Sequence, residues 1–295
     1  MPSFRSKLVY WVTKGVVKTF YNPHSSIQRI RKEFVITTKL IPQRSAGKFE
    51  SVTVDGIPSL WVIPDKITSS KVVLYFHGGG YSVCGPETHK NMCSIMAKES
   101  GLKFLLIDYR LAPENPFPAA IEDALKAYSW LLKTYDASQI IFGGDSAGGG
   151  LTVSTLLSLK DQGKKLPYKA FCLSPWLDLA STGPSYQTNR NSDAYIDYAS
   201  IRRWSKFYAE ESMHKHPLVS PLYGDLTGLP PMMVQVSSIE ILMSDSVEFA
   251  KKAKEAGVDM DLEIWEDMVH VWQMWTGILP EALQSIQMLA KFIKS

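Results

Sequence analysis

The amino-acid sequence predicts an α/β protein with a mostly parallel central sheet of about eight strands, helices on both faces and a helical cap. From residue 71 onward, strand-like and helix-like segments alternate, which is typical of a parallel sheet covered on both faces. A polar and aromatic segment from about residue 181 to 222 interrupts this alternation. With 295 residues and 45% hydrophobic composition, the chain is expected to form a single domain, 1–295, with a substantial core.

Short apolar runs predict the strands, and longer periodic segments predict the helices. The predicted strands are Lys71–Phe76, Lys103–Asp108, Gln139–Phe142, Ala170–Ser174, Met232–Val236 and Asp261–Trp265. The predicted helices are Glu87–Glu99, Phe117–Lys133, Ala147–Leu159, Asp245–Ala256 and Glu281–Ile293. Extra strands at one edge of the sheet are predicted at Phe34–Lys39, Val52–Val54 and Leu60–Ile63.

Two segments outside the alternation, residues 1 to about 45 and about 181 to 222, are expected to form the cap. The second contains a predicted helix at Ser200–Ala209. A long insertion usually serves as a lid or binding surface. Because open α/β sheets bind ligands beyond the carboxyl ends of their strands, the cap is expected over that edge. Tyr195 and Trp204 are expected to pack within the cap, with contact to substrate as the alternative.

The N-terminal segment has helical periodicity with basic residues mostly off its apolar face. The residues near that face are Phe4, Leu8, Trp11, Val12, Val16 and Phe20. We favour a helix packed over its own protein, with a membrane-surface helix as the alternative. Lys14 and Lys18 interrupt any signal peptide, and no apolar run reaches the roughly 18 residues of a membrane span. We therefore expect no stable membrane insertion.

Net charge and cysteine content restrict the binding partners and the cellular compartment that we expect. The net charge of +3 is only mildly basic and predicts no nucleic-acid partner. Three cysteines cannot all pair and no Cys-x-x-Cys occurs, which indicates a reducing compartment, the cytoplasm, and no structural zinc. His214 and His216 lie in a polar stretch and are interpreted as solvated loop histidines. Monomer and homodimer both remain open.

The small residues of GGDSAGGG (143–150) surround Ser146 between an apolar strand-like run and a helix-like run. That setting disfavours a flexible linker, and neither the dinucleotide-binding pattern nor the phosphate-binding loop pattern is satisfied. The remaining pattern is Gly-x-Ser-x-Gly, the nucleophile elbow, in which a strained turn lifts the serine hydroxyl above the sheet. The sequence therefore predicts Ser146 as a nucleophile, with a glycine-rich turn as the alternative.

A second motif, HGGG at residues 77–80, follows the predicted strand Lys71–Phe76. Lipases and esterases place such a motif where backbone N–H groups face the substrate oxygen. Glycine is needed there because the oxyanion approaches the backbone closely. We predict the N–H groups of Gly78, Gly79 and Ala147 as the oxyanion donors, while His77 braces the loop.

These motifs are similar to those of the hormone-sensitive-lipase-like family of α/β-hydrolases, in particular its bacterial esterases. The shared segments are HGGG (77–80), DYRLAPENPFPAA (108–120), GDSAGG (144–149), SPWLDL (174–179) and AGVDMDLEIWEDMVHVW (256–272). The similarity covers about residues 60 to 295. It implies the α/β-hydrolase fold with a helical cap, hydrolysis of carboxylic esters, a Ser-His-acid triad and no cofactor.

The general base is predicted to be His270. Hydrolases of this fold carry serine, acid and histidine in that order along the chain. Among the histidines beyond Ser146, His270 alone follows the last predicted strand by a short loop.

The triad acid departs from the common family pattern, because this chain lacks the Asp-Pro-Leu of many relatives. Counting from the end of Met232–Val236 places Glu240 at that position. Glutamate can accept the imidazole Nδ1–H and fix the tautomer. Asp245 is a rival, but with Glu248 it fits a variant of the helix capping box. Asp267 is a second rival, too close to His270 on the same loop to reach the ring.

Together these residues predict a serine carboxylesterase that acts on short-chain, small-molecule esters and needs no cofactor or metal. A non-catalytic small-molecule-binding protein on the same fold is one alternative, although such proteins lose a triad residue. An amidase is the other, because amide and ester hydrolysis use the same triad.

Overall fold

The computed structural model describes residues 2–20 and 25–295 and, in the first helix, the side chains up to residue 16. The strands are β1 Lys48–Val54, β2 Ile57–Ile63, β3 Val72–Phe76, β4 Lys103–Ile107, β5 Ile140–Asp145, β6 Lys169–Leu173, β7 Met232–Ser237 and β8 Met260–Trp265. They form one eight-stranded sheet in the order β1-β2-β4-β3-β5-β6-β7-β8. Only the β1–β2 and β2–β4 pairs are antiparallel, which confirms the predicted mostly parallel sheet.

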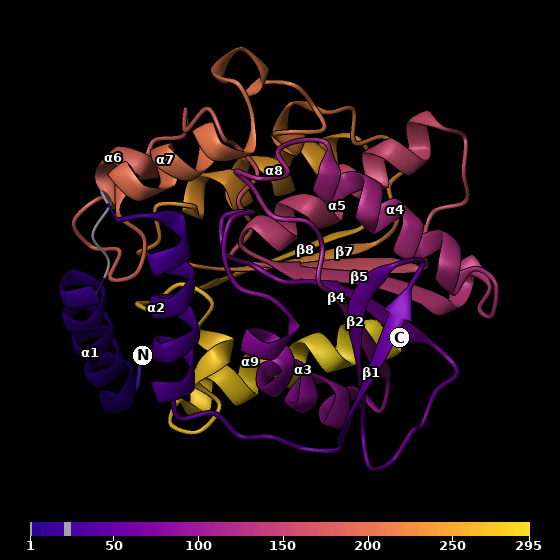
Figure 1. The fold of residues 1–295 in the computed structure, drawn as a ribbon, viewed down its shortest axis with the longest axis horizontal. Helices are drawn as coiled ribbons and strands as arrows, with labels where there is room; N and C mark the ends of the chain where they lie inside the picture. The colour runs from indigo at the N-terminus through magenta and orange to yellow at the C-terminus, as the bar shows by residue number, and fades with distance from the viewer. Residues whose placement is uncertain (1, 21–24) are drawn as a thin grey trace.

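Helices cover both faces of this sheet. The helices are α1 Phe4–Phe20, α2 Ile27–Leu40, α3 Pro86–Ser100, α4 Ala119–Leu131, α5 Ala147–Asp161, α6 Ser185–Thr188, α7 Tyr198–Tyr208, α8 Met243–Glu255 and α9 Pro280–Lys294. In Figure 1, α3 and α9 lie below the sheet and α4, α5 and α8 above it. Each face has its own apolar core: Tyr128, Leu151 and Phe249 belong to one, Met92 and Ile286 to the other.

The predicted strands and helices from residue 71 onward are all present, with ends shifted by a few residues. The predicted strand Phe34–Lys39 is wrong, because these residues lie in α2. Their β-branched run suggested a strand. However, Ile27, Ile30, Phe34 and Thr37 recur at helical spacing and are buried on one side. Tertiary packing of that face outweighs the local β-propensity.

Segments from the two predicted cap regions contact each other beside the carboxyl ends of the strands (Figure 1). Ile30 and Phe34 of α2 pack with Trp204 and Phe207 of α7 in one apolar cluster. The Phe34 and Trp204 rings have centroids 6.1 Å apart. Trp204 therefore packs against α2, which is the kind of packing role expected for it.

His214, in the second of these regions, was predicted to be solvated and is instead buried. Its Nε2 lies 3.2 Å from the carbonyl oxygen of Ser205 and 3.1 Å from that of Ala209. The polar sequence around it gives no sign of these backbone acceptors, which belong to the end of α7.

Helix α1 packs against its own protein, but not through the predicted apolar face. Among its described side chains, up to residue 16, those of Ser6, Val9 and Thr13 are buried, and Val9 joins a cluster with Trp272 and Trp275. The apolar residues Phe4, Leu8, Trp11 and Val12 are exposed instead. Phe20, which was predicted on the same face, lies outside the described side chains. Across residues 2–20 and 25–295, no helix is both long and apolar enough to span a membrane.

Candidate active site

Ser146 lies at the sharp connection between β5 and α5. Its φ of 51° and ψ of −122° form a backbone conformation that non-glycine residues rarely adopt. The Ser146 N–H donates to the Leu173 carbonyl at 2.9 Å. A Cβ on Gly144 would collide with the Gly148 carbonyl, and one on Gly148 with the Phe76 carbonyl. The small residues around the serine are therefore required by close backbone approach, as expected for an elbow.

Asp145, the residue before this serine, ties the loop after β3 to the elbow. Its buried carboxylate accepts hydrogen bonds from Tyr75 Oη at 2.8 Å, the Gly78 N–H at 3.1 Å and His89 Nε2 at 3.2 Å. Burial alone would raise the pKa of Asp145, but the charge of His89 and the hydrogen bonds from His89 and Tyr75 outweigh it and lower the pKa. Asp145 is therefore a charged structural partner of the active-site loops.

The prediction of Gly78 as an oxyanion donor is contradicted by its hydrogen bond to Asp145. Gly79 and Gly80 line the cavity beside the elbow serine, whereas Gly78 does not. Within the described residues, the Gly79 and Gly80 N–H groups donate no hydrogen bond. Ala147 is the first residue of α5, so its N–H has no acceptor within the helix. The sequence could not reveal which glycine the neighbouring carboxylate engages.

His77 braces this loop, as predicted. Its Nδ1 lies 2.7 Å from the Gly78 carbonyl oxygen, and its ring stacks on Tyr109 with centroids 4.2 Å apart. Burial lowers the pKa of His77 to about 3. The ring is therefore neutral at physiological pH and its Nδ1–H donates to that carbonyl.

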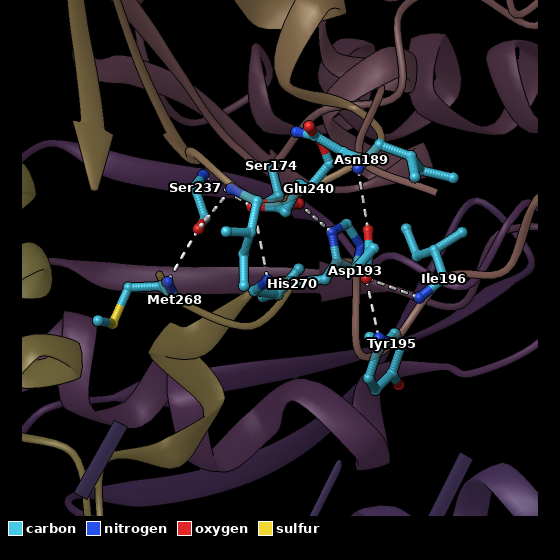
Figure 2. Close-up of polar contacts among 12 residues, drawn as sticks. Ser174, Asn189, Asp193, Tyr195, Ile196, Ser237, Glu240, Met268 and His270 are labelled. Atoms are coloured by element: carbon cyan, nitrogen blue, oxygen red, sulfur yellow. Dashed lines mark hydrogen bonds and ion pairs between the residues drawn. The ribbon is translucent and has the colours of Figure 1, made fainter. Parts of the chain in front are cut away.

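Glu240 and His270 meet in a buried contact at the carboxyl ends of β7 and β8 (Figure 2). Glu240 Oε2 lies 2.5 Å from His270 Nδ1. The other carboxylate oxygen, Oε1, accepts hydrogen bonds from Ser174 Oγ at 2.7 Å and from the Ser237 N–H at 2.8 Å. Both oxygens of Glu240 are therefore held, which fixes the carboxylate against the imidazole.

The surroundings of His270 favour its protonated form. Burial by itself lowers the pKa of His270, but the charge of Glu240, its hydrogen bond and the charge of Asp193 outweigh burial and raise it. Asp193 accepts hydrogen bonds from the Tyr195 N–H at 2.8 Å and the Ile241 N–H at 3.0 Å. Burial, followed by the charge of Glu240, raises the pKa of Asp193 to about 6.

The rival carboxylates have other surroundings. Asp245 is not the predicted helix cap, because α8 begins two residues before it. Its buried Oδ2 instead accepts from the Leu177 N–H, the Asp178 N–H and Tyr186 Oη at 2.9–3.0 Å. Asp267 is exposed, and its carboxylate forms no hydrogen bond within the described residues. Neither contacts the histidine ring.

A small cavity of about 40 Å³ joins Ser146 and His270. Phe34 of α2, Trp204 of α7 and Tyr195, which precedes α7, form walls of this cavity. Substrate contact, the alternative role considered for the two cap aromatics, is therefore geometrically open to them. In residues 2–20 and 25–295, no group of three or more His, Cys, Asp or Glu side chains is arranged to hold a metal ion.

Ser174, Ser237 and Asp193 were missed as members of the site. Ser174 lies in the SPWLDL motif directly after β6, and Ser237 is the last residue of β7. Their positions at strand ends were a usable signal, because parallel strands end at one edge of a sheet. Asp193 lies in the 181–222 insertion, where no motif marks it.

Comparisons with known proteins agree with this architecture. A family profile described as alpha/beta hydrolase fold matches residues 73–274. An acetyl-hydrolase of Streptomyces hygroscopicus is 39% identical over 83% of this chain and 82% of that protein. An esterase of Acinetobacter venetianus is 30% identical over 97% of this chain and 96% of its own length.

Solved structures give the same result. An esterase from the bacterial hormone-sensitive lipase family has a TM-score of 0.94 and 40% sequence identity, and covers 100% of this chain and 98% of its own. A hormone-sensitive lipase from a metagenome library has a TM-score of 0.94 at 34% identity over 100% of this chain and 98% of its own. The similarity therefore includes the N-terminal residues, which carry no motif.

Proposed function

Because the chain belongs to the hormone-sensitive-lipase-like family of α/β-hydrolases and is an esterase, we propose that it is a serine carboxylesterase for short-chain carboxylic esters. Ser146 is the nucleophile, His270 the general base and Glu240 the acid of the triad. The observation that carries this proposal is the Glu240–His270 contact, at 2.5 Å, on a cavity that the strained Ser146 also lines.

The proposed mechanism depends on which nitrogen of the His270 ring is hydrogen-bonded to Glu240. With His270 Nδ1–H donated to Glu240, Nε2 is left to accept the proton of Ser146 Oγ as the hydroxyl attacks the ester carbonyl. His270 then donates this proton to the departing alcohol. Water attacks the acyl-enzyme with His270 again as base, which releases the acid and restores the serine. Glu240 stabilises the imidazolium that forms in each half-reaction.

The oxyanion of each tetrahedral intermediate needs hydrogen-bond donors. We assign this role to the N–H groups of Gly79, Gly80 and Ala147, which replaces the predicted trio that included Gly78. One such donor contributes about 3–4 kcal/mol to transition-state stabilisation when a side chain supplies it.

The cavity supports short acyl chains. At about 40 Å³, it has room for a small acyl group beside Ser146, and the rings of Phe34 and Trp204 limit its extension. An amidase shares the triad, and no contact in the structure favours amides over esters. The non-catalytic alternative requires a missing triad group, whereas all of the proposed groups are present.

The compartment and partners follow the same proposal. We place the protein in the cytoplasm, because Cys84, Cys93 and Cys172 are all unpaired, as expected under reducing conditions. Its partner in this proposal is a small-molecule ester, with no nucleic acid and no stable membrane insertion.

Ser146→Ala tests the proposal. We expect loss of nearly all hydrolysis of p-nitrophenyl acetate in a normally folded protein, and a serine-directed phosphonate should label wild type once, at Ser146. Ser154→Ala is the matched control, because Ser154 lies buried within α5, the helix that follows Ser146, and its Oγ has no partner in the described part of the chain. Labelling of another serine, or full activity of Ser146→Ala, would contradict the assignment.

A further inference from the structure

Helix α1 carries large apolar side chains that its own protein leaves exposed. The exposed fraction is 84% for Phe4, 53% for Leu8, 67% for Trp11 and 45% for Val12. Their spacing of four, seven and eight residues from Phe4 places them on one helix face. A helix that only covers its protein would bury this face, so packing on the core does not explain these residues.

The exposed apolar surface extends to the neighbouring helix. Leu40, the last residue of α2, is 66% exposed. Leu8, Val12 and Leu40 also line one groove of about 210 Å³ between the two helices. We name Phe4, Leu8, Trp11, Val12 and Leu40 the N-terminal patch.

The charge of the same segment is strongly one-sided. Residues 1–45 contain nine Lys and Arg against the single Glu33, whereas residues 46–295 contain 23 Lys and Arg against 28 Asp and Glu. Arg5 and Lys7 on α1, and Lys32 and Lys39 on α2, are exposed. The mild net charge of the whole chain therefore hides a basic N-terminal surface on an otherwise acidic protein.

We propose that the N-terminal patch docks peripherally on a lipid bilayer that carries anionic headgroups. Exposed Trp, Phe and Leu on one face of a basic helix are suited to the boundary between headgroups and acyl chains. Nearby Lys and Arg add an attraction to anionic lipid. The charge argues against a second copy as the occupant, because a two-fold interface would bring the same basic surfaces together.

The N-terminal patch lies close to the cavity that contains Ser146. Thr38 and Tyr195 line both the groove beneath the N-terminal patch and the cavity with Ser146. The patch and the site therefore lie on the same side of the molecule, and docking brings the cap to the lipid. This inference goes beyond the proposed esterase activity, because binding can be measured without hydrolysis.

The test is co-sedimentation of the full chain with vesicles. We expect binding to phosphatidylcholine vesicles that contain phosphatidylglycerol, weaker binding to phosphatidylcholine alone, and release by high salt, because the Debye length falls from about 8 Å at 0.15 M to about 3 Å at 1 M. The double variant Lys7→Gln, Lys39→Gln should weaken binding about fivefold for each cation removed. Lys164→Gln, Lys165→Gln is the matched control on another exposed segment.

The apolar part is tested separately. Phe4→Ser with Trp11→Ser should reduce binding to the anionic vesicles at least tenfold, while Ile67→Ser, at a position 49% exposed away from the patch, should not. Hydrolysis of p-nitrophenyl acetate reports that each variant is folded. The proposal is overturned if wild type does not bind, if binding ignores headgroup charge, or if the patch variants change only a concentration-dependent dimer seen by size exclusion.

Discussion

The strand-end loops and the cap helices differ in what holds them together. In the strand-end loops, the buried carboxylates of Glu240, Asp145 and Asp245 accept hydrogen bonds from side chains and backbone N–H groups of several segments. The α2–α7 contact is instead an apolar cluster of aromatic and aliphatic side chains. Buried polar networks require near-complete satisfaction, whereas apolar contacts tolerate changes of shape more readily.

This difference predicts different outcomes of mutation in the two regions. A change in a strand-end loop should alter turnover, its pH dependence or folding, according to which hydrogen bond or charge is lost. A change in the cap should alter which esters are accepted. The predictions below separate the two behaviours.

The largest expected effect after Ser146→Ala is that of Glu240→Gln. Glutamine is nearly isosteric but can present an amide N–H to His270 and favour the wrong tautomer, so kcat should fall by up to about 10⁴. Steady-state kinetics at saturating p-nitrophenyl acetate measures this. Unchanged kcat in folded protein would contradict the assignment of Glu240 as the triad acid. It would also contradict the proposed dependence of turnover on the strand-end network.

These two regions were also unequally predictable from sequence. Ser146, His270 and Glu240 could be proposed together from the sequence because each follows a strand, and the ends of parallel strands meet at one edge. The strand error at Phe34–Lys39 arose because the burial of α2 depends on α7, which is distant in sequence. Gly78 and Asp245 were misjudged for a related reason, since their hydrogen-bond partners are distant in sequence, at the end of β5 for Gly78 and after β6 for Asp245.

A cap substitution should change selectivity more than rate. Trp204→Ala removes a ring that lines the cavity and lies against Gly80, so the ratio of kcat/KM for p-nitrophenyl hexanoate over acetate should rise, by about tenfold if one to two methylenes gain contacts. The ratio cancels the amount of folded enzyme. Trp61→Ala, on the opposite part of the sheet beside Trp130, is the control and should leave the ratio unchanged. An unchanged ratio in Trp204→Ala would exclude the cap wall as a determinant of acyl length.

The acid limb of the pH–rate profile should respond to Asp193. His270 must be neutral to act as base, so kcat/KM falls as pH decreases through its pKa, which Glu240 and Asp193 raise above the usual value of about 6.5. Asp193→Asn removes one of these charges and should move the midpoint to lower pH, with little change in rate at pH 8.

Asp267→Asn is the matched control for this shift. Asp267 is on the same loop as His270 but is exposed, so its substitution should leave the midpoint in place. If both variants or neither variant moves the midpoint, Asp193 does not act on His270 through its charge.

The smallest expected effect is that of Asp245→Asn, although Asp245 is as buried as Glu240 and only five residues away. Burial and the charge of Asp178 raise the pKa of Asp245 well above its usual range, despite the hydrogen bonds it accepts. Because the folded-state pKa exceeds the unfolded one, the proton's contribution to stability is lost as pH rises through the folded-state value. Asparagine keeps one oxygen for the three donors and removes the charge.

We therefore expect Asp245→Asn to change the free energy of unfolding by no more than about 1 kcal/mol at neutral pH. As pH rises, the stability of the variant should increase relative to that of wild type. Asp245→Ala should cost more, about 1–3 kcal/mol for each buried donor left without an acceptor. Urea unfolding at several pH values measures both, and kcat should be unchanged in Asp245→Asn. Loss of turnover in folded Asp245→Asn, with retention in Glu240→Gln, would transfer the role of triad acid from Glu240 to Asp245. Retained turnover in Asp245→Asn and its loss in Glu240→Gln would show that the two neighbouring buried carboxylates have different roles. Glu240 would act in catalysis, because it alone of the two contacts the imidazole, and Asp245 would act in stability.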